Sequence, residues 1–252
     1  MNPRPLPESI CFRVTRFCNA RCSFCLAPPD GSHPSLEMLV QRADWLLAHG
    51  VRSIHCCGGE PTIHPGLPKL LRHIHANGGS NKLTTNGIQI SDALLESLVS
   101  TRTEVKVSLH GDREHHNAMT RCEAFDPATK NIRRLLSAGI STSIQTTVVK
   151  GHESMVQWVG DFCLITGIRR LSILPFIPRG DGSVHRDIFE LNHADRARLR
   201  DQVRQMRRVL GGQLDVRWLD FTAQPVHVVE PDGRVLLEGA TESVDQLICR
   251  IP

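Results

Sequence analysis

The sequence has no tyrosine among its 252 residues, and this absence removes the phenol as a catalytic acid, a base or a radical relay. It also has no apolar run of about twenty residues, the length needed to span a bilayer, so no membrane-spanning helix is predicted. The first residues lack the apolar core of a secretory signal. We therefore expect a cytoplasmic protein without a membrane partner.

Charge of one sign is not gathered into a continuous block. Lys and Arg number 30, Asp and Glu number 26, the formal net charge is +4, and the arginines are scattered. This pattern does not favour nucleic-acid binding. Hydrophobic residues make up 40% and charged residues 22% of the chain, as in a globular protein with one large core or one domain plus an extension.

Cysteine is abundant, with nine residues, but only one CxxC unit occurs. Without a secretory signal, free thiols and a metal site are expected rather than a disulfide framework. Cys18, Cys22 and Cys25 follow a short apolar stretch. Three thiolates on one loop can hold three irons of a cubane and leave the fourth iron open to a small molecule. Zinc, which favours four ligands in paired units, and a structural disulfide are the alternatives, and the spacing favours the cluster.

This CxxxCxxC pattern, with Phe24 before its third cysteine, resembles the radical S-adenosylmethionine (SAM) superfamily. The resemblance implies one [4Fe–4S] cluster ligated by Cys18, Cys22 and Cys25, with SAM chelating the open iron. Reduced cluster would cleave SAM to a 5′-deoxyadenosyl radical that abstracts a substrate hydrogen. An electron donor such as flavodoxin or ferredoxin is implied as a partner.

Two turns carry the expected SAM contacts on the second and third predicted strands. The resemblance assigns the GGEP turn to the SAM amino group, and the TNG turn to the ribose and methionine moiety. An ordinary strand-to-helix turn and an ordinary Asn-Gly turn are the alternatives, and the positions favour the functional reading. The residues concerned are Gly58, Gly59, Glu60, Pro61, Thr85 and Asn86.

The fourth predicted strand ends at Ser108, and Arg121 lies thirteen residues further on. Viperin and the sulfatase-maturating enzymes have a Ser and an Arg at such positions that bind the SAM carboxylate, a group that a guanidinium matches with two parallel bonds. Many relatives have Asp where this chain has His110. We expect a hydrogen-bonding role behind the site for that histidine, with substrate contact as the alternative.

Apolar runs alternate with amphipathic stretches through the first two thirds of the chain. This alternation predicts an α/β fold with a parallel sheet, and the resemblance implies a partial (β/α)6 TIM-like barrel. We expect residues 1–185 to form this barrel and residues 186–252 to form a small α+β extension covering its mouth. Strands are predicted at 9–15, 53–57, 82–85, 104–108, 143–149 and 170–175.

Cys249 is the one cysteine of the extension. It either packs as a small apolar residue or donates a hydrogen atom to a substrate radical. The absence of an auxiliary-cluster domain and this lone cysteine resemble neomycin C epimerase, an aminoglycoside epimerase. That resemblance implies inversion of one sugar carbon of an aminoglycoside, with Cys249 as the catalytic hydrogen donor.

Three rival functions stay open. A viperin-like nucleotide dehydratase is compatible with the arginine-rich helix expected at 192–210. A peptide-modifying radical SAM enzyme usually carries a separate peptide-recognition domain, for which the chain is short. An iron–sulfur electron carrier or sensor has no need of the GGEP, TNG and Ser108/Arg121 features.

Overall fold

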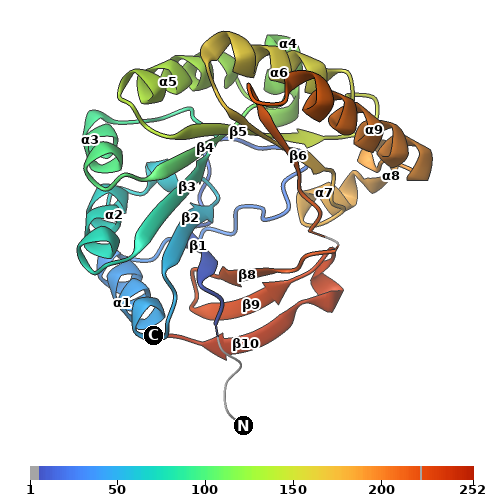
Figure 1. Cartoon of the computed structure of the whole chain (residues 1–252). Helices are drawn as coiled ribbons and strands as arrows, with labels where there is room; N and C mark the ends of the chain where they lie inside the picture. The colour runs from blue at the N-terminus through green and yellow to red at the C-terminus, as the bar shows by residue number, and fades with distance from the viewer. Residues whose placement is uncertain (1–5, 222) are drawn as a thin grey trace.

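A curved ten-stranded sheet forms the centre of the fold, with the strand order β10-β9-β8-β1-β2-β3-β4-β5-β6-β7 (Figure 1). The structure is a computed structural model and describes residues 6–221 and 223–252. Strands β1 to β7 run parallel to one another and β8 runs parallel to β1, whereas β9 pairs antiparallel with both β8 and β10. The strands are β1 (Ser9–Thr15), β2 (Ser53–Gly58), β3 (Ser80–Thr85), β4 (Glu104–Ser108), β5 (Thr142–Val148), β6 (Arg170–Pro175), β7 (Asp215–Trp218), β8 (Val226–Val229), β9 (Arg234–Glu238) and β10 (Gln246–Arg250).

Helices cover the outer face of the sheet (Figure 1). Ser35, Ser91 and Asn192 begin three of them by accepting a hydrogen bond from a first-turn backbone amide, which satisfies an otherwise unpaired donor. Within the described residues no helix is long and apolar enough to cross a membrane. The helices are α1 (Leu36–Ala48), α2 (Leu67–Ala76), α3 (Asp92–Ser100), α4 (Arg113–Thr120), α5 (Phe125–Ser137), α6 (Met155–Thr166), α7 (Asp181–Val184), α8 (Arg186–Phe189) and α9 (His193–Leu210), with short 3₁₀ turns η1 (Pro61–Ile63) and η2 (Glu242–Val244).

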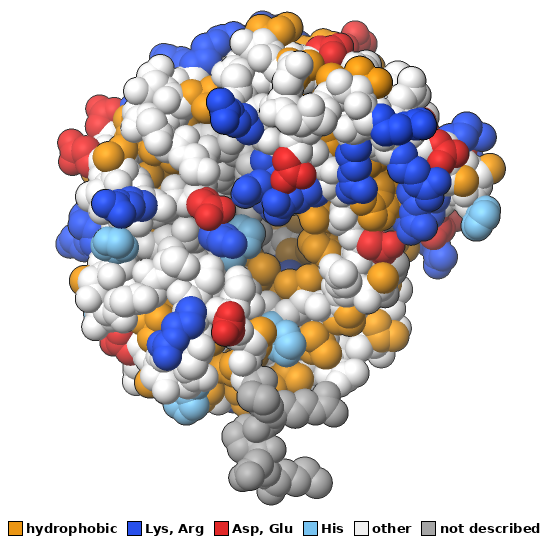
Figure 2. All heavy atoms as spheres, in the orientation of Figure 1, with side chains coloured by type: hydrophobic (Ala, Val, Ile, Leu, Met, Phe, Trp, Pro, Cys, Tyr) orange, Lys and Arg blue, Asp and Glu red, His pale blue; other side chains and the backbone are white. Residues whose placement is uncertain are grey.

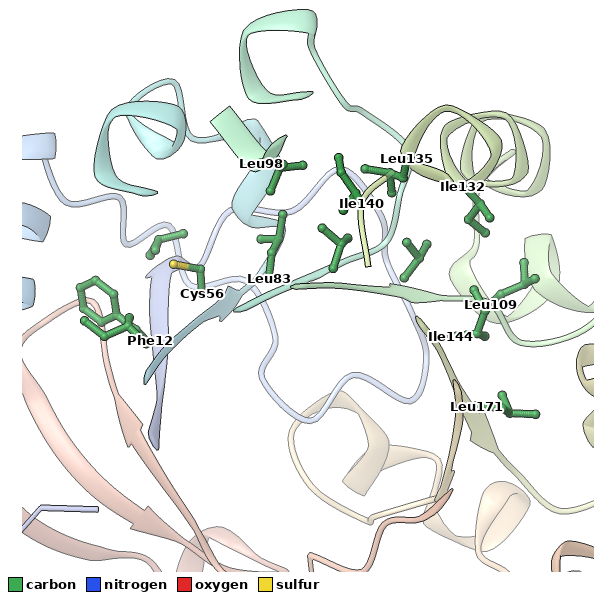
Figure 3. Close-up of a cluster of buried hydrophobic side chains, with 14 of the residues drawn as sticks. Phe12, Cys56, Leu83, Leu98, Leu109, Ile132, Leu135, Ile140, Ile144 and Leu171 are labelled. Carbon is green, nitrogen blue, oxygen red and sulfur yellow. The ribbon is translucent and has the colours of Figure 1, made fainter. Parts of the chain in front are cut away.

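The main hydrophobic core lies between the sheet and its helices. Phe12, Cys56 and Leu83 are fully buried, and Figure 3 shows Leu83 pointing toward Leu98 of α3. Because successive strand residues point to opposite faces, the other half of each strand faces the barrel interior. The predicted α/β fold with a partial TIM-like barrel is therefore confirmed.

The extension lengthens the sheet at both edges. Strand β7 pairs with β6, and β8 pairs with β1, followed by the β8–β9–β10 antiparallel unit. The predicted 186–252 boundary falls just after α7, at the start of α8. The strands of the extension thus lie beside the barrel strands, an arrangement that the sequence analysis did not predict.

A buried ion network fastens the extension to β1. The guanidinium of Arg13 donates to both carboxylate oxygens of Glu238, at 2.7 and 2.8 Å, and to Glu230. Arg179, which follows β6, donates to Glu238 at 3.1 Å and to both oxygens of Asp245 at 2.8 and 2.6 Å. Arg13, Arg179 and the two glutamates are all buried, so the charges depend on one another for compensation.

Candidate active site

A cavity of about 200 Å³ opens between the cysteine loop and the carboxyl ends of β2 to β6. This is the end at which active sites of parallel barrels are built. Figure 1 shows the loop that follows β1 crossing the far side of the barrel opening. The structure brings these predicted residues together on the cavity wall: Cys18, Cys22, Cys25, Phe24, Gly58, Gly59, Glu60, Thr85, Asn86 and Ser108.

Local hydrogen bonds shape the cysteine loop. The amide of Cys25 donates to the carbonyl of Cys22 at 3.1 Å, and the amide of Ala20 points at Cys18 Sγ at 3.4 Å. The amide of Arg21 donates to the carbonyl of Thr120 at 3.0 Å. The loop is therefore held both by its own turn and by the end of α4.

The chemistry of the three thiols fits a cationic group between them. Burial raises the pKa of Cys18 to about 11 and also raises the pKa values of Cys22 and Cys25. A bound metal reverses this balance, because its charge stabilises the thiolates. In the described part of the chain, no three His, Cys, Asp or Glu side chains converge on one point as a single metal ion requires. A cubane does not require such convergence, since each thiolate binds a different iron.

The two glycines of the GGEP turn are needed for close packing against the cysteine loop. A Cβ at Gly59 would lie 2.1 Å from the carbonyl oxygen of Phe17, and one at Gly58 would lie 2.2 Å from that of Thr15. The amides of Gly59 and Glu60 donate to these same two carbonyls at 2.8 Å. The turn thus fixes the position at which the cysteine loop leaves β1.

The Glu60 carboxylate joins the ends of β2 and β3. One oxygen accepts from the Thr62 amide at 3.0 Å and from the Thr62 and Thr85 hydroxyls at 2.7 Å, and the other accepts from the Asn86 amide at 2.7 Å. Burial raises the pKa of Glu60. The Asn86 side chain in turn donates to the side-chain oxygen (Oδ1) of Asn19 at 2.7 Å. These bonds hold the two predicted SAM turns and the cysteine loop in one arrangement.

Substituting Glu60 with alanine is expected to destabilise the protein by about 1–3 kcal/mol, because the buried Thr85 hydroxyl and the partly buried donors of Thr62 and Asn86 lose their acceptor. SAM affinity should fall with it, since the same bonds shape the cavity wall. Thermal unfolding and SAM titration of Glu60→Ala measure the two effects. A variant with wild-type values for both would show that the cavity does not depend on this carboxylate.

His110 lines the cavity and is buried. Its Nδ1 accepts from the Thr147 amide at 3.1 Å, and its own amide donates to His116 Nδ1 at 3.2 Å. Burial keeps the pKa of His110 well below its ordinary value, so the ring is neutral and carries its proton on Nε2. His110 has the supporting hydrogen bond expected of it, and it also lies on the cavity wall.

Three predicted residues are not on the cavity wall. Pro61 is buried at the start of η1, next to the wall residue Glu60. Arg121 is exposed, with a left-handed backbone (φ 56°) at the end of α4. Cys249 lies on β10, beside Val235 of β9, and packs against the main core. The structure therefore does not bring Cys249 to the cavity, because β8 and β9 separate β10 from β1.

Some wall residues were missed in the sequence. Gln145 and Thr147 on β5, and Arg21 in the cysteine loop, all line the cavity. The sequence did carry a signal for Gln145 and Thr147. In the predicted strand at 143–149, these polar residues lie two positions apart, although a strand buried on both faces is expected to be apolar throughout. No comparable signal marked Arg21, whose place depends on the path of the loop.

Arg121→Ala is expected to weaken SAM binding by about 1–3 kcal/mol, the worth of hydrogen bonds to a charged group. The side chain makes no hydrogen bond or ion pair with the described residues and begins next to Thr120, which lines the cavity. Titration of the reconstituted protein with SAM measures the change, and Arg133→Ala, on the exposed side of α5, is the matched control. Unchanged affinity in Arg121→Ala together with weaker binding in Arg21→Ala would assign the carboxylate contact to Arg21.

A partial barrel with three cysteines at the carboxyl ends of its strands defines a class of iron–sulfur enzymes. The family model of the Radical SAM superfamily matches residues 12–155, more than half of the chain. The protein therefore belongs to the radical SAM superfamily, and its cofactors are a [4Fe–4S] cluster and SAM.

Relatives of known name include a GTP 3′,8-cyclase of Chlorobaculum tepidum, 34% identical over 146 residues, which are 55% of this chain and 44% of that protein. The match thus spans less than half of the cyclase. Among solved structures, Streptococcus suis SuiB bound to S-adenosylmethionine has a TM-score of 0.78 at 18% identity, covering 97% of this chain and 60% of that one. Native anSMEcpe with bound AdoMet and a peptide has a TM-score of 0.75 at 18% identity, with coverages of 92% and 74%. At this identity the two structures show the fold alone.

Proposed function

We propose that this protein cleaves SAM reductively and abstracts a hydrogen atom from a small molecule of the nucleotide class. The observation that supports the SAM chemistry is the cavity itself. It gathers three cysteines, the GGE turn, Thr85, Asn86 and Ser108 from successive strand ends.

The bound cofactors supply the radical, and the protein supplies placement. Cys18, Cys22 and Cys25 are the candidate iron ligands, and the polar groups of Asn86 and Ser108 are the candidate contacts of SAM. The cysteine loop, lying across the cavity, would exclude water from the reacting atoms. A low-potential electron donor of the flavodoxin or ferredoxin kind is required to reduce the cluster.

The nucleotide class is supported by the sequence relative named as a GTP 3′,8-cyclase. The peptide-modifying alternative has only the fold likeness in its favour. An aminoglycoside epimerase with Cys249 as hydrogen donor is not favoured, because that thiol lies on β10 and outside the cavity lining. None of the relatives described above is named as an epimerase.

Anaerobic assays with a panel of substrates test this proposal. Reduced, reconstituted protein is incubated with SAM and, separately, with GTP, ATP, CTP, UTP, an aminoglycoside or a peptide. We expect a nucleotide to increase 5′-deoxyadenosine formation and to yield a product of altered mass or retention. An increase with only the aminoglycoside or only the peptide would contradict the nucleotide class.

A further inference from the structure

Two lysines face the barrel interior, directly next to the cavity. Thr84 and Ser108 line the cavity from β3 and β4. Lys82 and Lys106 precede them by two positions on the same strands, and residues two apart on a strand point to the same face. The register agrees, because Lys106 lies beside Thr84 across the two strands. Both lysine side chains therefore belong to the inner wall, one layer of side chains away from those that line the cavity.

These lysines have no carboxylate to themselves. The nearby carboxylates already pair with arginines. The Arg170 guanidinium lies 3.6 Å from a carboxylate oxygen of Glu104 and 3.7 Å from one of Asp215, and Arg217 Nε lies 2.7 Å from the same Asp215 oxygen. Neither Lys82 nor Lys106 forms an ion pair with the described residues.

Lys106 is half-buried. Burial is the main cause that lowers the pKa of its ammonium group; Cys11 acts against it, and the charges of Lys82, Arg170 and Arg217 act with it. A half-buried ammonium group near three other cations and without a carboxylate partner is unfavourable for folding. Figure 2 shows Lys and Arg side chains gathered beside the central hollow of this face, with few acidic side chains among them.

We propose that Lys82 and Lys106 form an anion-binding subsite that holds the phosphate groups of the substrate. On β3, β4, β6 and β7 there are four cations, against two carboxylates, and a phosphate chain supplies further negative charge. The cations are Lys82, Lys106, Arg170 and Arg217, and the carboxylates are those of Glu104 and Asp215. Ammonium groups bind phosphate as point charges, and two on adjacent strands can contact neighbouring phosphates. This inference rests on the proposed function, whose nucleotide substrate it would hold below the SAM cavity.

The test is binding of inorganic triphosphate, GTP and guanosine to the reconstituted protein, measured by calorimetry. The variants are Lys82→Met and Lys106→Met, with Lys130→Met as the matched control, since Lys130 is exposed on the outer helix α5. We expect the wild type to bind triphosphate and GTP, and to bind guanosine with an affinity at least tenfold lower. Each inner-wall variant should weaken triphosphate binding at least tenfold, and the control should stay within twofold of the wild type.

Stability separates loss of the subsite from loss of the fold. Without ligand, the melting temperature of Lys106→Met should not fall below that of the wild type, because the substitution removes a half-buried charge that no carboxylate pairs with and keeps an apolar side chain of similar length. Triphosphate should raise the melting temperature of the wild type and leave that of Lys106→Met unchanged.

Two outcomes would overturn the subsite: triphosphate that does not bind, or binding that Lys82→Met and Lys106→Met leave intact. SAM cleavage by the same wild-type sample, measured without any nucleotide, is the separate test of the proposed function. Triphosphate binding without SAM cleavage would reject the enzyme function and keep the anion site. Cleavage without triphosphate binding would reject the subsite alone.

Discussion

Alanine in place of Cys18, Cys22 or Cys25 is expected to leave the protein without an intact [4Fe–4S] cluster and without SAM cleavage. Each thiolate would ligate one iron, and a cubane with only two protein ligands is not retained. The loop geometry supports this expectation, because all three side chains line one cavity beside Gly59 and Glu60. Iron and sulfide content per chain and the electron paramagnetic resonance signal after reduction measure the loss.

Cys249→Ala is the matched control for these variants. It removes a partly buried thiol from β10, outside the cavity, so iron content and SAM cleavage should equal those of the wild type. Full iron content and SAM cleavage in all three loop variants would reject the cluster assignment. A loss of cleavage in Cys249→Ala with its cluster intact would restore a catalytic role for that thiol.

Arg13→Met is expected to lower the free energy of unfolding by about 3–5 kcal/mol, the cost of removing one partner from a buried ion pair. Glu230 would then keep only Arg16, at 3.6 Å, and Glu238 only Arg179, at 3.1 Å, to compensate their buried negative charges. The β8–β9–β10 unit should loosen first, since Arg13 connects it to β1. Denaturant unfolding and hydrogen exchange of the β9 amides measure the two effects.

Two controls accompany this variant. Arg234→Met breaks the solvent-exposed pair with Asp232, at 2.6 Å, and should cost no more than about 1 kcal/mol. The triple variant Arg13→Met, Glu230→Gln, Glu238→Gln should recover part of the lost stability. The two glutamine side chains are neutral, so the loss of Arg13 no longer leaves buried negative charges without a partner. If Arg13→Met and Arg234→Met lowered the free energy of unfolding by the same amount, the buried ion network would not be what holds the extension to β1.

The barrel core was predictable because its signals are local. Apolar runs bounded by Gly, Pro and polar turns identified β1 to β6 within a few residues, and Ser35 and Ser91 marked two helix starts. Helix α4 was missed, because its sequence, REHHNAMT, has almost no apolar periodicity. Its one signal was Asp112, whose carboxylate accepts from the His115 amide at 3.0 Å as the N-cap.

The placement of the extension and the charge network were not predictable, because they depend on long-range pairing. The strand that carries Cys249 was missed altogether, and nothing in the sequence places β8 beside β1. Arg13 pairs with Glu230 and with Glu238, and each of these pairs joins residues more than 200 positions apart in the sequence. The inward direction of Lys82 and Lys106, by contrast, follows from the alternation of predicted strands and could have been read from the sequence.

Production of 5′-deoxyadenosine from SAM by the anaerobically reconstituted, reduced protein tests the central claim most directly. The account predicts 5′-deoxyadenosine and methionine in equal amounts from the wild type and from Cys249→Ala, and neither product from Cys22→Ala. A wild-type protein that holds a full [4Fe–4S] cluster, accepts an electron and binds SAM, yet forms no 5′-deoxyadenosine, would contradict it.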